Sequence, residues 1–256
     1  MSKLLTGAVV ATAMATTSAF AADLPAKAPP PTPAAAAYSW SAFYIGGNIG
    51  SAWRSNGDWT DTAFGLTWPG NSNNGVLIGG GQIGFNVQYN QLVFGVEFDS
   101  DWTTTNSNND LGVIVPGVGT IALTGNERWI ATLAARFGVT WDRVLFYGKA
   151  GGGWVTANDL TITNVTTGAG IVNVGDRTNP GWLLGAGIEW AFAPSWSIKL
   201  EYDYLGLASR TFTIPAGAPF LAGDTFNSGS RNIQMVKLGV NFLLNWGAPT
   251  AVRAAY

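Results

Sequence analysis

Apolar and polar residues alternate with a period of two in the chain beyond Trp40. In residues 196–204, one parity carries Trp196, Ile198, Leu200, Tyr202 and Tyr204, and the other carries Ser197, Lys199, Glu201 and Asp203. Residues 92–99 repeat the pattern. Successive side chains of a β-strand point to opposite faces, so this period predicts strands with one apolar and one polar face.

The alternation recurs in eight segments and predicts an all-β chain. The segments span residues 42–53, 76–89, 92–102, 128–140, 144–156, 181–192, 196–206 and 231–244. Two further pairs of short segments, 113–115 with 120–123 and 160–165 with 171–174, resemble hairpin arms. We expect these arms to extend the third to sixth strands beyond the sheet, and a ten-stranded sheet is the alternative.

Charged residues in these segments all lie on the polar parity. Six acids face six bases there, and we expect them to form one charge network: Glu97, Asp99, Asp101, Glu189, Glu201 and Asp203 with Arg128, Arg136, Lys149, Lys199, Arg231 and Lys237. Asn, Gln and many Gly residues share this face. Such a sheet fits a soluble barrel with an apolar lumen, or a barrel whose apolar exterior lies in lipid.

The tryptophans favour the lipid-facing barrel. Nine of the 12 lie on the apolar parity near segment ends: Trp53, Trp102, Trp129, Trp141, Trp154, Trp182, Trp190, Trp196 and Trp246. Aromatic residues gather in this way at the two interfaces of membrane barrels. A narrow, crowded lumen also suits a charge-balanced face that is rich in glycine better than a solvated surface does.

The connections between segments alternate in length. Residues 90–91, 141–143 and 193–195 form short connections, whereas residues 54–75, 103–127, 157–180 and 207–230 form four long loops. Short periplasmic turns and long external loops are typical of outer-membrane barrels. The sequence therefore predicts an eight-stranded antiparallel transmembrane β-barrel with its long loops outside the cell.

The lumen of an eight-stranded barrel is just wide enough to be filled by side chains. The short turn at residues 141–143 sets Arg136 opposite Lys149, with Glu97, Asp99 and Glu189 as available partners. The next short turn sets Glu189 near Lys199. We interpret the network as a self-satisfied plug. The alternatives are a wet path for small ions or solutes and, least favoured, catalysis by paired carboxylates.

Composition narrows the function further. The 256 residues are 47% hydrophobic and 11% charged, and they include no Cys and no His. This excludes a disulfide framework, a thiol nucleophile, a Ser-His-Asp triad and the commonest metal ligands. The net charge of −2 gives no indication of nucleic-acid binding. We therefore expect no enzyme, no cofactor, no metal site and no nucleic-acid partner.

The N-terminus predicts export. Lys3, an apolar run over residues 4–15 and the sequence Ala19-Phe20-Ala21 match the three regions of a secretory signal peptide. We expect a signal peptide at 1–21, a periplasmic linker rich in Pro and Ala at 22–39, the barrel at 40–246 and a tail at 247–256. The G-x-G-x-x-G match at residues 79–84 lies inside a strand, so it does not indicate dinucleotide binding.

Several strings also resemble the small outer-membrane β-barrel proteins of alphaproteobacteria, known as outer-membrane immunogenic or porin-family proteins. They are SAFYIGGNIGSAW, GGGQIGFNVQYNQLVFGVEFDSDW, RWIATLAARFGVTWDRVLFYGKAGGGW, GWLLGAGIEWAFAPSWSIKLEYDYLGL and VKLGVNF. The family is similar to the transmembrane domain of outer-membrane protein A and to the opacity proteins. The resemblance implies a structural protein of the cell outer membrane, in contact with lipids and lipopolysaccharide and exposed through its loops to protein or host-surface partners.

Barrels of this family end in an aromatic residue that closes the last strand and serves as an assembly signal. Here Phe242, Trp246 and Tyr256 are the candidates, because a tail follows Phe242. The haemin binding linked to relatives lacks a His ligand in this chain. From sequence we expect a structural barrel with a plugged lumen that contributes to envelope integrity and surface interaction. A small-solute pore is the alternative.

Overall fold

The computed structural model describes residues 38–244, apart from gaps in the long loops at 63–64, 66, 69–74, 105–110, 116–118, 125–126, 158–160, 165, 168–169, 174–176, 214–222 and 224. The predicted signal peptide and nearly all of the linker lie outside the described residues, as do Trp246 and the tail. The predicted domain boundaries therefore remain predictions.

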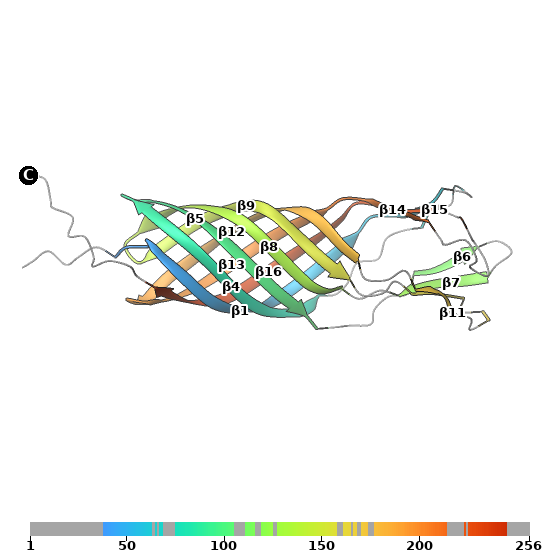
Figure 1. Ribbon diagram of the computed structural model, residues 1–256, viewed down its shortest axis with the longest axis horizontal. Helices are drawn as coiled ribbons and strands as arrows, with labels where there is room; N and C mark the ends of the chain where they lie inside the picture. Colours follow the sequence, from blue (N-terminus) through green and yellow to red (C-terminus); the bar gives the residue numbers. More distant parts are fainter. Residues whose placement is uncertain are drawn as a thin grey trace, which may run out of the picture. The chain divides into compact units, whose positions relative to one another are not determined.

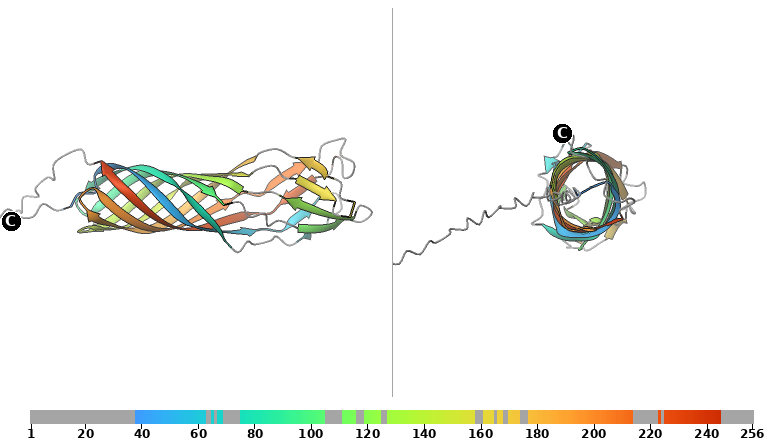
Figure 2. Two further views of the ribbon diagram at one scale, coloured as in Figure 1. Left: turned by 90° about the horizontal axis from the view of Figure 1, so that it is seen from below. Right: turned by 90° about the vertical axis from the view of Figure 1, so that its left-hand side faces the viewer.

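Eight long strands form a closed antiparallel barrel (Figures 1 and 2). They are β1 (Ala42–Asn56), β4 (Val76–Tyr89), β5 (Leu92–Thr103), β8 (Glu127–Trp141), β9 (Val144–Ala157), β12 (Arg177–Ala193), β13 (Trp196–Leu207) and β16 (Arg231–Leu244). Their order around the barrel is β1-β16-β13-β12-β9-β8-β5-β4. The predicted all-β, eight-stranded barrel is confirmed, and pairing of β1 with β16 removes the open sheet edges.

The two ends of the barrel differ in their connections. Two-residue turns at 90–91, 142–143 and 194–195 join the strands at one end, which we call the inner end. Asn90 and Asp142 adopt a left-handed backbone with φ of 55° and 53° in two of these turns, a conformation that Asn and Asp tolerate. The long connections all leave the opposite end, which we call the outer end.

In their described parts, the long connections carry two small sheets of four strands each, which lie beyond the outer end (Figure 1). One is built in the order β14-β15-β2-β3 from β2 (Trp59–Asp61), β3 (Thr67–Trp68), β14 (Arg210–Thr213) and β15 (Thr225–Ser228). The other is built in the order β11-β10-β7-β6 from β6 (Leu111–Val115), β7 (Gly119–Thr124), β10 (Thr161–Asn164) and β11 (Gly170–Asn173).

The second small sheet revises the prediction for the hairpin arms. Strands β6 and β7 pair as one hairpin and β10 and β11 as another, as their sequences indicate. The two hairpins pair with each other through β7 and β10. The ten-stranded alternative is wrong because these arms form their own sheet and do not enter the barrel.

The apolar parity faces outward along every barrel strand. Leu238 on β16, Ile83 on β4 and Phe137 on β8 are 48%, 54% and 51% exposed. A chain with this much exposed apolar side chain around a closed ring needs an apolar solvent, which the hydrocarbon of a bilayer provides. The soluble-barrel alternative, which requires an apolar lumen and a polar exterior, is therefore excluded.

Eight of the nine predicted girdle tryptophans lie in described strands. Trp53, Trp102, Trp129, Trp154 and Trp182 lie toward the outer end, and Trp141, Trp190 and Trp196 toward the inner end. Trp129 is half-buried and its indole N–H donates to Ser100 Oγ at 2.8 Å, whereas the other seven are exposed. The tryptophans thus form two bands that flank the apolar exterior.

Candidate functional site: the barrel lumen

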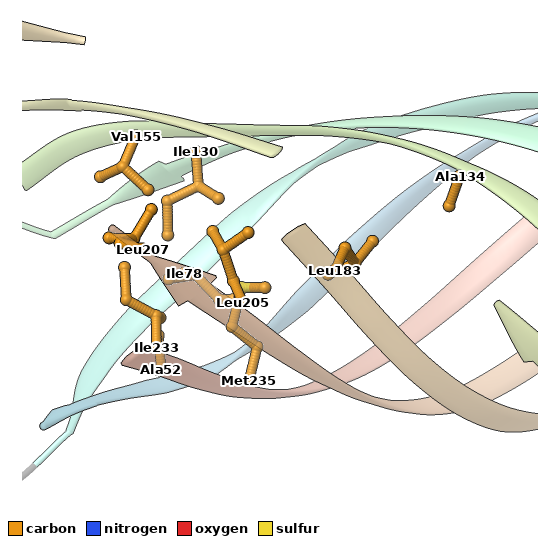
Figure 3. Packing of buried hydrophobic residues seen from close by; sticks show 10 residues of the cluster. All are labelled: Ala52, Ile78, Ile130, Ala134, Val155, Leu183, Leu205, Leu207, Ile233 and Met235. Carbon is orange, nitrogen blue, oxygen red and sulfur yellow. The ribbon is translucent and has the colours of Figure 1, made fainter. Parts of the chain in front are cut away.

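Side chains fill the lumen in three layers along its axis. Ten buried residues form the outer apolar layer, most of them near the outer end and Ala134 further along β8, in register with Glu97: Ala52, Ile78, Ile130, Ala134, Val155, Leu183, Leu205, Leu207, Ile233 and Met235 (Figure 3). Eight near the short turns form the inner apolar layer: Trp40, Ala42, Tyr44, Val93, Leu145, Tyr147, Ala191 and Leu243. Charged side chains occupy the space between, which we call the charged layer.

The order of residues along single strands places the charged layer between the apolar ones. Strand β16 runs from Met235 in the outer layer through Lys237 to Leu243 in the inner layer. Strand β9 runs from Tyr147 in the inner layer through Lys149 to Val155 in the outer layer. These two strands therefore contribute to all three layers of the lumen through side chains of one parity.

Ten of the twelve residues predicted for the charge network lie in the charged layer. They are Glu97, Asp99, Asp101, Arg136, Lys149, Glu189, Lys199, Glu201, Asp203 and Lys237, and none is more than 4% exposed. They come from β5, β8, β9, β12, β13 and β16, so the layer joins most of the barrel wall.

Two predicted members lie elsewhere. The pairing of β8 with β9 shifts between Glu127 and Trp129, which marks a β-bulge. A bulge redirects side chains, and Arg128 is exposed. The prediction that Arg128 faces the lumen is therefore corrected. Arg231 keeps the inward parity but is half-buried at the outer end of β16, beyond Ile233 of the outer apolar layer.

The positions of Arg128 and Arg231 outside the charged layer change the balance of charge in the lumen. Four bases now face six acids in the charged layer, whereas the sequence predicted six against six. A buried charge is tolerated when it is paired and hydrogen-bonded. The excess of acids makes each of the four cations the shared partner of several carboxylates.

Arg136 lies at the inner side of the charged layer and has the most specific surroundings. Its guanidinium lies 2.7 Å from Glu189 Oε2 and 3.3 Å from Glu97 Oε2. It also donates to Tyr44 Oη at 2.6 Å and lies 3.9 Å from the ring centre of Tyr147. Two carboxylates and two aromatic side chains therefore hold one guanidinium in place.

Three lysines occupy the centre and outer side of the charged layer. Lys149 Nζ lies 2.7 Å from Glu201 Oε1 and 3.3 Å from Asp203 Oδ2. Lys199 Nζ lies 3.0 Å from Glu97 Oε2. Lys237 completes the layer, because its Nζ lies 2.9 Å from Asp203 Oδ2, 3.2 Å from Asp99 Oδ1 and 3.6 Å from Asp101 Oδ2.

The predicted neighbours in this layer agree with the strand register. Arg136 pairs with Lys149 across β8 and β9, and Glu189 pairs with Lys199 across β12 and β13. The charges do not all interact along these pairs, however. Glu189 binds Arg136, and the ammonium of Lys199 contacts Glu97 across the lumen.

Uncharged polar side chains extend the network in ways that the sequence analysis did not anticipate. Tyr44 and Tyr147 donate to Glu97 and Glu201 at 2.8 and 2.7 Å. Another set links β1, β4, β16, β12 and β13 through hydrogen bonds of 2.5–2.8 Å and consists of Asn48, Gln82, Asn241, Glu189 and Ser197. Their shared inward parity was the sequence signal that could have identified them.

Glycines on the lumen side make room for these large side chains. A Cβ atom at Gly84 would collide with the phenol of Tyr44, and one at Gly187 with the phenol of Tyr147. A Cβ atom at Gly185 would collide with Asp203 Oδ1. The glycine-rich polar face thus reflects the space that a narrow lumen leaves for side chains from neighbouring strands.

Three carboxylates of the charged layer lie close enough together to be candidate ligands of a metal ion. Oxygens of Glu97, Asp99 and Glu201 lie within 4.8 Å of one another. The ammonium groups of Lys149 and Lys199 contact all three carboxylates, at 2.7–3.8 Å. The cluster is therefore already neutralised by protein cations and does not fit a metal ion.

Trp40 closes the inner end and was also missed by the sequence analysis. It precedes β1, is fully buried, and donates its indole N–H to Thr140 Oγ1 at 3.1 Å. Its backbone N–H donates to Gln88 Oε1 at 2.7 Å, and the ring of Tyr38 lies edge-on at 5.2 Å. The sequence placed Trp40 only as the start of the barrel domain, because no strand pattern covers it.

These features define the class of the protein. A closed antiparallel barrel with an apolar exterior, two aromatic bands and a charged lumen is an outer-membrane β-barrel. No helix in the described part of the chain is long and apolar enough to cross a membrane.

Comparison with known proteins agrees with this class. Residues 7–242 match the family model for the outer membrane protein beta-barrel domain, and the chain belongs to this family. It is 31% identical over 246 residues to the 31 kDa outer-membrane immunogenic protein of Brucella melitensis, covering 90% of this chain and 95% of that one. It is 28% identical to the 22 kDa outer membrane protein of Rhizobium leguminosarum, covering 81% of this chain and 80% of that one.

A solved structure shares the fold. The outer membrane protein OprG of Pseudomonas aeruginosa aligns with a TM-score of 0.52 and 14% identity, covering 80% of this chain and 98% of that one. The expected resemblance to outer-membrane immunogenic proteins and the expected outer-membrane location are thus confirmed. The inner end of the barrel is its periplasmic face, and the outer end faces the outside of the cell.

Proposed function

We propose that this protein is a structural component of the outer membrane, with a lumen closed to solutes and outer loops that contact other molecules. The observation that carries the proposal is the three-layer filling of the lumen. Apolar layers lie on both sides of a charged layer in which no ionisable side chain is more than 4% exposed. Such a barrel contributes to the envelope by spanning it stably.

An enzymatic role is not supported by the site. The carboxylates of the charged layer contact lysine or arginine, and apolar residues separate them from both ends of the barrel. A general acid or base must reach its substrate directly or through one water. The absence of His from the whole chain supports the same conclusion.

The outer sheets support the surface role. They raise eight short strands beyond the barrel, which gives the exposed loops a defined backbone. Related proteins bear the name outer-membrane immunogenic protein, and exposure outside the cell would account for that name. We propose the same exposure here, with lipopolysaccharide and a protein or host-surface molecule as partners.

Conductance in a planar lipid bilayer tests the closed lumen. Folded protein is expected to insert without discrete current steps, because ions meet an apolar layer at each end. Regular single-channel steps from the folded protein would contradict the proposal and favour the small-solute pore. The excess of acids over bases in the charged layer would then predict a preference for cations.

Envelope integrity and surface contact can be separated by a loop-shortened variant. Replacing residues 104–126 and 158–176 with short turns removes the β6-β7-β10-β11 sheet and leaves the barrel strands intact. In a strain lacking the protein, this variant is expected to restore the resistance of the cells to detergent but not their binding to the surface partner. A variant that restores neither function while folding normally would contradict the division of roles.

A further inference from the structure

The inner apolar layer differs from the outer one because one of its residues, Trp40, comes from outside the barrel strands. The outer apolar layer is built entirely from residues of barrel strands, seven of the eight contributing to it. The inner layer includes Trp40, which lies two residues before the start of β1 at Ala42. Trp40 can therefore leave the lumen without breaking any hydrogen bond between barrel strands.

Trp40 is fully buried among the apolar side chains of the inner layer, and its hydrogen bonds to described residues are few and local. Two hydrogen bonds hold it, one from the indole to Thr140 and one from the backbone N–H to Gln88. Tyr38 packs against it, and the guanidinium of Arg143 lies 5.7 Å from the Tyr38 ring. All of these partners lie at the inner end: Gln88 and Thr140 are next to the last residues of β4 and β8, Arg143 is in a turn, and Tyr38 precedes β1.

A pocket lies next to the side chains that hold Trp40. This pocket of about 440 Å³ lies at the inner mouth, lined by Tyr38, Gln88, Thr140 and Trp141 and by residues of the neighbouring short turns. It borders the side chains that hold Trp40, namely Gln88, Thr140 and Tyr38. An outward movement of the segment 38–40 thus has room to begin without displacing a barrel strand.

We propose that Trp40 is a removable stopper whose withdrawal opens the periplasmic half of the lumen while the outer apolar layer stays closed. The opened space is a dead-end vestibule that ends at the charged layer, with Arg136, Glu189 and Ser197 at its floor. The barrel then has two states, sealed and open to the periplasm, and neither connects the two sides of the membrane.

The absence of Cys from the chain allows a direct test. Ala191→Cys places a thiol in the inner apolar layer, where Ala191 is fully buried, and Ala52→Cys places one in the outer layer, where Ala52 is 2% exposed. The rate of reaction with a charged, water-soluble thiol reagent is measured in detergent, with the folded fraction followed by its gel mobility.

Each thiol reporter is combined with Trp40→Ala. The thiol at position 191 is expected to react about tenfold faster or more when Trp40 is removed, whereas the thiol at position 52 keeps its rate. Thr140→Val retains Trp40 but removes the acceptor of its indole, so a smaller acceleration at position 191 is expected. Trp196→Ala is the matched control, because Trp196 lies at the inner end outside the lumen, is 44% exposed and does not line the pocket.

Two results would overturn the proposal. One is equal protection of position 191 with and without Trp40, which would mean that other residues seal the inner end. The other is a parallel acceleration at positions 191 and 52, which would mean that Trp40 stabilises the whole barrel. Bilayer conductance is expected to stay silent in the Trp40→Ala variant, so the stopper and the closed lumen are tested separately.

Discussion

Arg136 and Glu189 form a direct ion pair, with 2.7 Å between Nη2 and Oε2, although they lie 53 residues apart on β8 and β12. Strand β9 lies between these two strands in the barrel. The pair therefore crosses β9 on its lumen side and links two strands that share no backbone hydrogen bond. Its effect on stability is accordingly separable from strand pairing.

Arg136→Ala is expected to lower the free energy of unfolding by about 3–5 kcal/mol, because it leaves Glu189 buried without the cation that binds it and removes one of the cations that contact Glu97. Reversible urea unfolding in detergent or lipid vesicles measures the change. Arg128→Ala is the control, since it removes an arginine from the same strand that is exposed, and should change stability by about 0.5 kcal/mol or less. Equal losses in the two variants would contradict the lumen network.

Gly84→Ala tests the space that glycine leaves in the lumen. The added methyl group collides with the Tyr44 phenol, which must move away from Arg136 and Glu97. A loss of about 1–3 kcal/mol is expected in the same unfolding measurement. Gly81→Ala lies on the same strand, where the nearest atom to the new methyl is Gly46 O at 3.4 Å, and should be nearly neutral. A larger loss for Gly81 than for Gly84 would refute this assignment.

Leu238→Arg tests the depth of the lipid-facing surface. Leu238 is 48% exposed and lies near the middle of β16, in register with Ile49 and Leu200 on the neighbouring strands. The charge is expected to cost about 2–4 kcal/mol at the centre of the bilayer and about 1 kcal/mol or less at its edge. Leu244→Arg at the inner end of the same strand supplies the edge value. Similar costs at both positions would argue against a membrane centred on Leu238.

The ionisation of Tyr38 is expected to make the stability of the protein depend on pH in the alkaline range. Burial raises the pKa of Tyr38 from 10.0 to about 12, so the folded protein favours the neutral phenol. Its contribution to stability is complete below pH 10 and is lost as the pH rises toward about 12. Tyr38→Phe keeps the ring against Trp40 and should remove this alkaline loss. The free energy of unfolding is measured for both proteins across this pH range. Parallel curves for the wild type and for Tyr38→Phe would contradict the prediction.

Local pattern determined much of this protein from the sequence alone. All eight barrel strands were predicted within a few residues of their ends, because the period of two assigns each residue to a face. Short turns fixed the register of neighbouring strands, which is how Arg136 and Lys149 were predicted as neighbours. Family strings and tryptophan positions then identified the lipid-facing side and the outer membrane.

Only the tertiary structure decided which side chains meet inside the barrel. Lys237 reaches Asp99 from 138 residues away, and Lys199 reaches Glu97 from 102. Such contacts depend on barrel closure and on the stagger of all eight strands, which no local pattern records. The bulge at Arg128 interrupts the alternation of faces by a single residue, and Trp40 carries no strand pattern, so the positions of both side chains were decided by packing.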